Sequence, residues 1–582
     1  MPYKTIKSLI VSFALVFVLS CASRPSDGTH TLHIYTTNDI HGHYFDSTYV
    51  DDNIQGSLLA VSQYINEQRA RYGKGNVILL DGGDFLQGDN AAYYHNFVDT
   101  RSPHVYAEMA AYMGYDAVIV GNHDIEAGPA VYNRMKKDLK MPLLAANAID
   151  RSTGECHFQE YTIVERQGLR IAVIGLTNPS MRTWLGEDKL DDMDFVNPMK
   201  GFAQQIVDKV RARENPDAVV FVIHAGTGNG DGKMKESQGL DLLQSLQGVD
   251  LVVCAHDHHP MVVDNDDIDL IDAGSHCNMV GHAILALEVK DGKVVSRNMK
   301  VENINIDKKV VDKAMSARFH PVYEKVKEFS NKEIGSLKMD LRTREAFRGM
   351  NNYLNFVHSV CLEATGADIC FAAPLKFNGF VKKGTVLYND LFTIYPYENQ
   401  LFVITMSGKE IKAYLEASYD GWINTVKGRQ NETLLKIVPE NDARTGQKGW
   451  SFVNRSYNFD SASGINYTVD VTAPKGRRIN ISSMADGTAF DPQATYKVTT
   501  TSYRVNGGGG LMKAAGIPDA EPRIIARDKE IRDMVYDYFL AHGTVTPELV
   551  SKAEIIGSWK FVPADVAEPL LDQDMERLFP KR

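Results

Sequence analysis

Between residues 31 and 300, short apolar runs alternate with longer segments whose apolar residues recur at helical spacing. The runs "LHIYTTND", "NVILLDGGD" and "DAVIVGNHD" are typical of buried strands, whereas "GSLLAVSQYINEQRA" and "AVYNRMKKDL" are typical of amphipathic helices. Four more strand-like runs follow: "RIAVIGLT", "DAVVFVIHAG", "VDLVVCAHDHH" and "IDLIDAGS". This alternation predicts a layered α/β domain over residues 31–307.

The hydrophobic pattern changes after residue 307. Residues 308–340 are charged and carry a helical pattern, so we expect a helical linker there. Residues 341–558 open with the helical run "AFRGMNNYLNFVHSVCLEATG" and end with strand-like runs such as "INYTVDVT", which predicts a second, α+β domain. We expect residues 559–582 to form a polar tail.

The N-terminus has the layout of a signal peptide over residues 1–20, because Lys4 and Lys7 precede the short apolar run "LIVSFALVFVLS". The segment "VLSC" resembles a bacterial lipobox. This resemblance implies lipidation of Cys21 and attachment to the bacterial cell envelope, periplasmic or associated with the outer membrane. The alternative is a plain secretory signal with an incidental cysteine. Residues 21–30 are expected to be a flexible tether.

Composition narrows the function classes. The chain has 582 residues, 44% of them hydrophobic, which is sufficient for more than one core. Its net charge is -11 and its basic residues are scattered, which argues against binding long nucleic acid but allows capture of a small anion. After Cys21 the cysteines are odd in number and show no CxxC spacing, so a thiolate metal site is not expected. Cys361 and Cys370 could form a disulfide or remain buried thiols.

Polar side chains follow five of the predicted strands. Because ligands of open α/β sheets bind outside the carboxyl ends of strands, we expect these side chains to converge in space. They are Asp39 and His41, Asp84, Asn122 and His123, His224, and His256 and His258. In an extended segment, an Asp-x-His or His-x-His pair would point both side chains to one side.

Each motif alone has a simpler interpretation. "GNHD" alone would be a turn, with Asn at positive φ and Asp capping the next helix, and "DGGD" and "HDHH" could likewise be turns or solvated loops. Five strand-end motifs with one ligand chemistry favour a metal site instead. Imidazole, carboxylate and amide groups without thiolates suit zinc, manganese, iron or cobalt. A carboxylate can bridge two such ions, which would clamp a phosphoryl group and activate water.

The motif order D-x-H, G-D, G-N-H, H-x-G, H-x-H resembles the calcineurin-like dinuclear metallophosphoesterases, and the surrounding sequence is similar to the secreted 5'-nucleotidase family. The resemblance covers most of residues 31–300 and roughly residues 341–515. It implies a four-layer α/β/β/α sandwich followed by a nucleotide-binding domain. It also implies one ion held by Asp39, His41, Asp84 and His258, and a second held by Asp84, Asn122, His224 and His256, with Asp84 bridging.

The resemblance gives His123 a different role. It would stand at the rim of the site, donating a hydrogen bond to the phosphoryl oxygens or protonating the leaving alkoxide. A carboxylate three residues later, here Glu126, would orient it. The family more often has Asp or Asn at this position. The longer Glu126 side chain changes the geometry of the His123–Glu126 pair but does not affect the metal ligands.

The second domain carries the expected substrate contacts. Tyr397 and Tyr503 fall where the family places two base-stacking aromatic residues, and Asn122 would also face the substrate. The alternative is that both tyrosines only pack at strand ends. The stretch "APLKF" replaces the Gly-Gly-Ile-Arg stretch of 5'-nucleotidases and leaves Lys376 as the nearest cation. In this respect the chain is more similar to 2',3'-cyclic-nucleotide 2'-phosphodiesterases that are also 3'-nucleotidases.

Two other functions stay open at this point. One is a 5'-nucleotidase or UDP-sugar hydrolase on the same scaffold, and the other is a nucleotide-binding lipoprotein without turnover. Retention of every proposed metal ligand argues against the second. Because the metal ligands and the tyrosines lie on separate domains, domain rotation or closure would bring the substrate to the ions.

Overall fold

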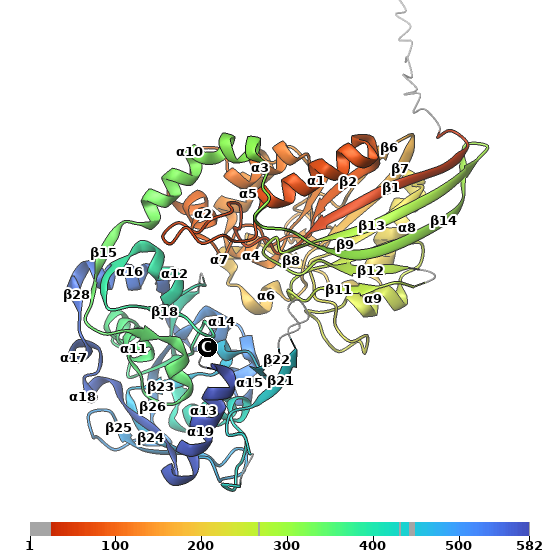
Figure 1. The fold of residues 1–582 in the computed structure, drawn as a ribbon. Helices are drawn as coiled ribbons and strands as arrows, with labels where there is room; N and C mark the ends of the chain where they lie inside the picture. Colours follow the sequence, from red (N-terminus) through yellow and green to blue (C-terminus); the bar gives the residue numbers. More distant parts are fainter. Residues whose placement is uncertain (1–24, 266–267, 398, 430–431, 442–447, 581–582) are drawn as a thin grey trace, which may run out of the picture.

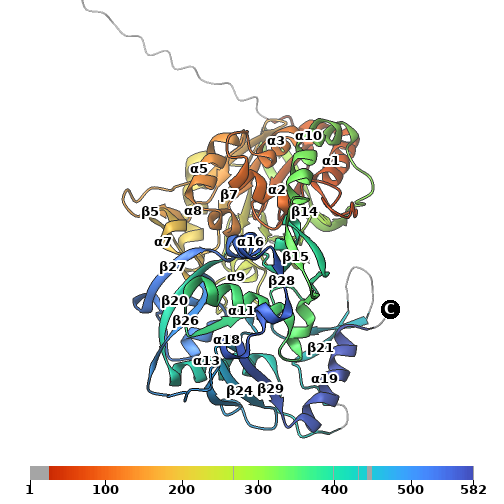
Figure 2. The ribbon, with the colours of Figure 1, turned by 90° about the vertical axis from the view of Figure 1, so that its left-hand side faces the viewer.

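A computed structural model describes residues 25–265, 268–397, 399–429, 432–441 and 448–580. The chain forms two domains joined through the long helix α10 (Lys313–Ser330), as Figures 1 and 2 show. Cys21 and the proposed signal peptide lie outside the described residues. Within the described ranges, no helix is long and apolar enough to cross a membrane.

The first domain is built on two six-stranded sheets. The first has the order β14 (Lys293–Asn305), β13 (Met279–Lys290), β1 (Gly28–Thr37), β2 (Val77–Asp81), β3 (Ala117–Ile119) and β4 (Leu143–Leu144). The second has the order β11 (Met261–Val263), β12 (Asp269–Asp272), β10 (Leu251–Cys254), β9 (Ala218–Ile223), β7 (Leu169–Leu176) and β6 (Tyr161–Arg166). Strands β1 to β4 are mutually parallel, as are β7, β9, β10 and β12.

The two sheets pack face to face. Their facing side chains, among them Ile34, Leu80, Val220 and Val253, form one buried cluster. Helices α1 (Leu58–Tyr72), α3 (Val105–Met113) and α5 (Pro129–Asp138) cover the other face of the first sheet, and α8 (Phe202–Glu214) and α9 (Gly239–Ser245) cover the other face of the second. The strands are continuously apolar because both faces are buried. The α/β/β/α sandwich is therefore confirmed.

Helix α10 is present where the linker was expected, and it is also part of the first domain's core. Its residues Met315, Phe319 and Val326 are buried against the helices of that domain. Asp312 caps the helix, because its Oδ1 accepts the backbone N–H groups of Ala314 and Met315 at 3.0 Å. The second domain starts immediately after this helix, with β15 (Glu333–Leu337).

The second domain has a central five-stranded sheet in the order β23 (Ser461–Ser463), β17 (Ile369–Ala372), β26 (Thr495–Thr501), β20 (Gln400–Ser407) and β27 (Ile524–Glu530). Helix α11 (Asn352–Thr365) packs on one face and α13 (Gly408–Trp422) on the other. The predicted α+β architecture is confirmed. Cys361 and Cys370 lie on α11 and β17 as buried free thiols, so the disulfide alternative does not apply.

The expectation of a polar tail over residues 559–582 is wrong. Strand β29 (Gly557–Val562) pairs in parallel with β24 (Ile465–Asp470), and the helix α19 (Ala564–Leu578) follows it. The helix buries Leu570, Leu571 and Leu578 in the core of the second domain. The segment looked polar because charged residues are spread along its whole length, although the leucines share one helical face.

Candidate dinuclear metal centre and nucleotide pocket

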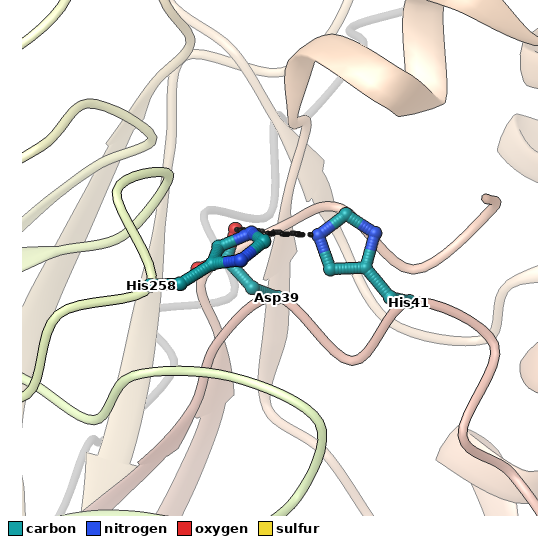
Figure 3. Close-up of side chains that lie close together, drawn as sticks. All are labelled: Asp39, His41 and His258. Carbon is teal, nitrogen blue, oxygen red and sulfur yellow. Dashed lines mark hydrogen bonds and ion pairs between the residues drawn. The ribbon is translucent and has the colours of Figure 1, made fainter. Parts of the chain in front are cut away.

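The ends of β1 and β10 supply a first group of metal-ligating side chains, Asp39, His41 and His258 (Figure 3). His41 Nε2 lies 2.9 Å from His258 Nε2. The Asp39 Oδ1 atom lies 3.5 Å from His258 Nε2 and 3.9 Å from His41 Nε2. Three ligand atoms from segments more than 200 residues apart in the chain thus meet at one point.

A second group lies beside the first and contains Asp84, His224 and His256. His224 Nε2 lies 3.1 Å from Asp84 Oδ2 and 3.1 Å from Asn122 Oδ1, and His256 Nδ1 lies 2.8 Å from Asn122 Oδ1. Asp84 Oδ2 is also 4.0 Å from His41 Nε2 of the first group. Asp84 is therefore placed between the two groups, where a bridging carboxylate would stand.

These donor sets fit two divalent ions. Ligand atoms about 2.1 Å from one ion stand roughly 3.0 to 3.4 Å from each other, which matches most of the spacings above. Burial lowers the pKa of His256 to about 3 and that of His41 well below its usual value, so both imidazoles are neutral and can donate a lone pair. The mixture of nitrogen and oxygen atoms without thiolates does not select one metal.

The electrostatics of the centre attract positive charge. Burial opposes protonation of His224, but the carboxylates of Asp84 and Asp39 outweigh this and raise its pKa to about 10. Burial likewise opposes ionisation of Asp84, yet the surrounding imidazoles hold its pKa well below the ordinary value. The buried carboxylates of Asp39 and Asp84 require a cation beside them, and divalent ions meet that requirement.

The backbone of the ligand-bearing loops is unusual. Five of the proposed ligands have positive φ: Asp39 (46°), His41 (48°), Asp84 (59°), His256 (82°) and His258 (59°). The extended geometry expected for the Asp-x-His and His-x-His pairs is therefore wrong, because the chain turns as soon as each strand ends. A left-handed residue that is not glycine costs about 1 to 3 kcal/mol and is typical of functional sites.

Hydrogen bonds between the loops hold this backbone. Asp39 N–H donates to Gly83 O at 3.0 Å, and His41 N–H donates to Asp84 O at 2.9 Å. Side-chain orientation is also set, because His224 Nδ1 donates to Gly82 O at 2.8 Å. Contacts of this kind orient metal ligands in proteins. All three are accepted by backbone carbonyl groups, so the sequence carried no signal for them.

Asp124 connects the ends of β2 and β3. Its carboxylate accepts the backbone N–H groups of Asp84, Phe85 and Leu86 at 3.0 Å and of Gly121 at 2.7 Å. The last of these bonds caps α4 (Asn122–Glu126), as the turn interpretation of "GNHD" expected. Asn122 does not have the positive φ of that interpretation; it is the first residue of the helix. The motif thus serves as a cap and presents a ligand at the same time.

Glycine is required before Asn122. A Cβ atom on Gly121 would lie 2.1 Å from Asp84 Oδ1 and 2.3 Å from Asp84 N. No side chain fits at this point without displacing the proposed bridging carboxylate. The glycine of "GNH" therefore allows the ends of β2 and β3 to approach each other.

His123 belongs to neither ligand group. Its Nδ1 is hydrogen-bonded to Glu126 Oε2, and its backbone N–H donates to Asp84 Oδ1 at 2.8 Å. The imidazole is partly exposed, and its centroid lies 5.4 Å from that of His41. The structure thus pairs His123 with Glu126 at the rim of the metal centre, although Glu replaces the shorter carboxylate or amide of the family.

The predicted tyrosines lie together with a third one that the sequence analysis missed. The ring of Tyr457 meets Tyr397 edge-on at 6.2 Å and Tyr503 edge-on at 6.4 Å between centroids. Burial raises the pKa of Tyr397, and the neighbouring Tyr457, Tyr503 and Glu126 raise it further. Pro396, which directly precedes Tyr397, accepts a hydrogen bond from Gln87 Nε2 of the first domain at 3.3 Å, so this end of the tyrosine cluster lies next to the first domain. A lone Tyr in "NRSYNF" gave no pattern by which to find Tyr457.

Lys376 lies in the loop that follows β17 in the second domain. It is half-buried and lines a cavity of about 580 Å³ together with Phe377, Asn378, Gly379, Phe380 and Thr393. Burial lowers the pKa of Lys376, and the guanidinium of Arg532 lowers it further. Among the described residues no carboxylate pairs with Lys376. The cavity therefore offers a cation to an anionic group.

Comparisons with known proteins agree with this architecture. Residues 32–260 match the model of the calcineurin-like phosphoesterases, and residues 331–516 match that of the 5'-nucleotidase C-terminal domain. A 5'-nucleotidase of Vibrio vulnificus is 24% identical over 88% of this chain and 92% of its own. The trifunctional nucleotide phosphoesterase YfkN of Bacillus subtilis is 24% identical over 91% of this chain and 39% of its own.

The fold has relatives of known structure as well. A Staphylococcus aureus protein assigned to the 5'-nucleotidases, solved with α-ketoglutarate, superposes with a TM-score of 0.75 at 20% identity and covers 91% of this chain and 99% of its own. Fold, domain pair and ligand groups together define a metal-dependent phosphoester hydrolase. The chain combines a calcineurin-like phosphoesterase domain with a 5'-nucleotidase C-terminal domain, and over most of its length it is similar to 5'-nucleotidases.

Proposed function

We propose that this enzyme hydrolyses 2',3'-cyclic nucleotides and 3'-nucleotides in preference to 5'-nucleotides. The observation that most supports a nucleotide substrate is a contact between the metal centre and the segment that carries Tyr397. The Gln87 side chain lies against the metal centre with Oε1 3.2 Å from His41 Nδ1, and its Nε2 donates to Pro396 O at 3.3 Å. Pro396 directly precedes Tyr397, so a stacked base and the metal ligands lie within reach of one small substrate.

Each residue near the reacting phosphate has a distinct task. Two divalent ions at the ligand groups would polarise the phosphoryl group and make water a nucleophile at neutral pH. Glu126 accepts a hydrogen bond from His123 Nδ1–H, which leaves Nε2 of that ring directed away from the pair. His123 can then donate a hydrogen bond or a proton to the leaving oxygen. Asn122, whose Oδ1 faces His224 and His256, completes the second ligand group.

The preference for cyclic and 3'-nucleotides rests on the second domain. "APLKF" replaces the arginine-bearing stretch of 5'-nucleotidases, and Lys376 lines a separate cavity in place of that arginine. The trifunctional relative YfkN supports activity on more than one nucleotide ester, whereas the Vibrio 5'-nucleotidase supports the 5' alternative. Rates of phosphate release from 2',3'-cyclic AMP, 3'-AMP, 5'-AMP and UDP-glucose decide between them. A higher kcat/KM on 5'-AMP than on 3'-AMP would exclude our assignment.

The metal requirement has its own test. Asp84→Asn removes the charge between the two ligand groups, so we expect nearly complete loss of turnover and fewer than two ions per chain by elemental analysis. Zinc, manganese, cobalt and iron should each be assayed for reconstitution, because the donor set does not distinguish them. Full activity of metal-stripped protein would contradict the proposal.

We also propose that Cys21 is lipidated and anchors the enzyme to a bacterial membrane through the tether of residues 21–30. Support comes from "VLSC" following a signal-like apolar run. Mass spectrometry of the mature N-terminus would detect the acyl groups. A Cys21→Ser variant should be released into the soluble envelope fraction, whereas an unmodified cysteine in the wild type would contradict the anchor.

A further inference from the structure

Trp184 packs directly against a proposed metal ligand. Its indole is stacked on the imidazole of His256, with centroids 5.5 Å apart and ring planes 16° apart. Aromatic pairs in this range attract each other, so the indole opposes rotation of the imidazole. His256 needs such support because its φ of 82° lies in the strained left-handed region. The direction of its Nδ1 lone pair therefore depends on Trp184.

The helix that carries Trp184 is firmly anchored. Helix α6 (Met181–Trp184) starts with Met181, which is fully buried in the core of the first domain. Arg182 Nε forms an ion pair with Asp194 Oδ1 at 3.2 Å. A short helix fixed in this way holds the indole at a constant position above His256.

The same residue is a docking point for the second domain. Asn506 Nδ2 donates to the backbone carbonyl of Trp184 at 3.0 Å, and Asn506 directly follows α14 (Ser502–Val505), which carries Tyr503. The adjacent helix α7 (Glu187–Leu190) adds two contacts, from Asp188 Oδ2 to Gln400 Nε2 and from Lys189 Nζ to Glu530 Oε1, both at 3.3 Å. Figure 1 shows α6 and α7 on the side of the first domain that faces the second.

We infer that Trp184 is a positioning residue that couples docking of the second domain to the orientation of His256. Its side chain holds the ligand, and its carbonyl receives the loop next to Tyr503. Docking of the nucleotide-binding domain then stabilises α6, and α6 stabilises the second ligand group. This inference rests on the proposed metal centre. The experiment must therefore distinguish a failure of the role of Trp184 from a failure of the metal centre itself.

The experiment measures ion binding rather than turnover. Metal-stripped protein is titrated with Mn²⁺ in competition with a chelator, for the wild type, Trp184→Ala and Trp184→Phe. Loss of a group that orients a ligand typically weakens the ion by about 10-fold or more, so we expect this change for one of two ions in Trp184→Ala. Trp184→Phe keeps a stacked ring and should stay close to the wild type. Trp450→Ala, in the second domain, is the matched control.

The coupling itself is tested by a double-mutant cycle. Asn506→Ala should weaken the same ion in the wild-type background and have little further effect in the Trp184→Ala background. Circular dichroism and thermal unfolding establish that each variant folds. The inference is overturned if Trp184→Ala binds both ions like the wild type, or if the Asn506→Ala effect is equal in both backgrounds. If the wild type itself binds no Mn²⁺ or other divalent ion, the proposed metal centre fails instead.

Discussion

Arg504 and Asp460 form a two-pronged ion pair in the interior of the second domain. Arg504 Nε donates to Asp460 Oδ2 at 2.9 Å, and Nη2 donates to Oδ1 at 2.7 Å. The remaining guanidinium protons are donated to Tyr457 O, Asn458 Oδ1 and Gly508 O at 2.6, 2.8 and 3.2 Å. One side chain thus fixes the two segments that present Tyr457 and Tyr503.

Replacement of Arg504 by lysine should damage nucleotide binding selectively. Lysine keeps the charge but lacks the planar fork, so it cannot hold Asp460 and the backbone near Tyr457 together. We expect kcat/KM on 3'-AMP to fall at least about 10-fold, since base stacking contributes about 1 to 3 kcal/mol. Activity on bis(4-nitrophenyl) phosphate, which has no base, should fall much less.

The control for this change is Arg523→Lys, which alters a more exposed ion pair with Glu410 in the same domain. Surface pairs contribute little to stability, so this variant should behave like the wild type on both substrates. Equal losses on both substrates in Arg504→Lys would mean that Arg504 supports the fold and not the base-binding residues.

The ring of Tyr503 lies against Gly508, in the space that a side chain at position 508 would occupy. Gly508→Ala should therefore displace the ring. A Cβ atom at this position would lie 2.4 to 2.5 Å from three atoms of the Tyr503 ring. Contacts this short are not tolerated, and the ring must move. We expect a loss in kcat/KM on 3'-AMP similar to that of Tyr503→Ala. Gly421→Ala, where the added atom would meet its nearest neighbour at 3.9 Å, serves as the control.

The same measurement can contradict this interpretation. Wild-type kcat/KM in Gly508→Ala combined with a strong defect in Tyr503→Ala would show that the ring position is not critical. A wild-type value in Tyr503→Ala would remove Tyr503 from the nucleotide pocket altogether.

His123→Asn should separate leaving-group chemistry from metal binding. Because His123 lies outside both ligand groups, the variant should retain two ions per chain while kcat falls by roughly 10²-fold or more. Glu126→Gln should give a smaller defect, since it weakens the orientation of the ring without removing it. Elemental analysis of the purified variant is decisive: loss of one ion would make His123 a ligand.

Much of this architecture could be predicted from the sequence, because strands buried on both faces leave long apolar runs and their polar ends stand out. The strained backbone at Asp39 and His256 could not be predicted, since loop closure and hydrogen bonds between strand ends impose it. Tyr457 and Trp184 were missed for a related reason. Each acts through a neighbour that is distant in the chain, and a single aromatic residue carries no periodic signal.

His358 on α11 should make the second domain sensitive to acid. It is buried, its Nδ1 has no hydrogen-bond partner within the described residues, and burial lowers its pKa from 6.5 to about 3. The unfolded chain binds a proton near its ordinary pKa while the folded chain does not. The resulting stability is complete above pH 6.5 and is lost progressively as the pH falls from 6.5 towards 3.

His358→Gln removes this titration. Between about pH 7.5 and about pH 5, its free energy of unfolding should change by about 2 kcal/mol less than that of the wild type. Denaturant unfolding followed by the fluorescence of Trp422 and Trp559, both in the core of the second domain, provides the measurement. His320→Gln, which removes an exposed imidazole, is the control and should keep the wild-type pH dependence. An unchanged pH dependence in His358→Gln would contradict this interpretation. It would mean that His358 binds its proton equally well in the folded and the unfolded chain, because only then does the group leave the free energy of unfolding independent of pH.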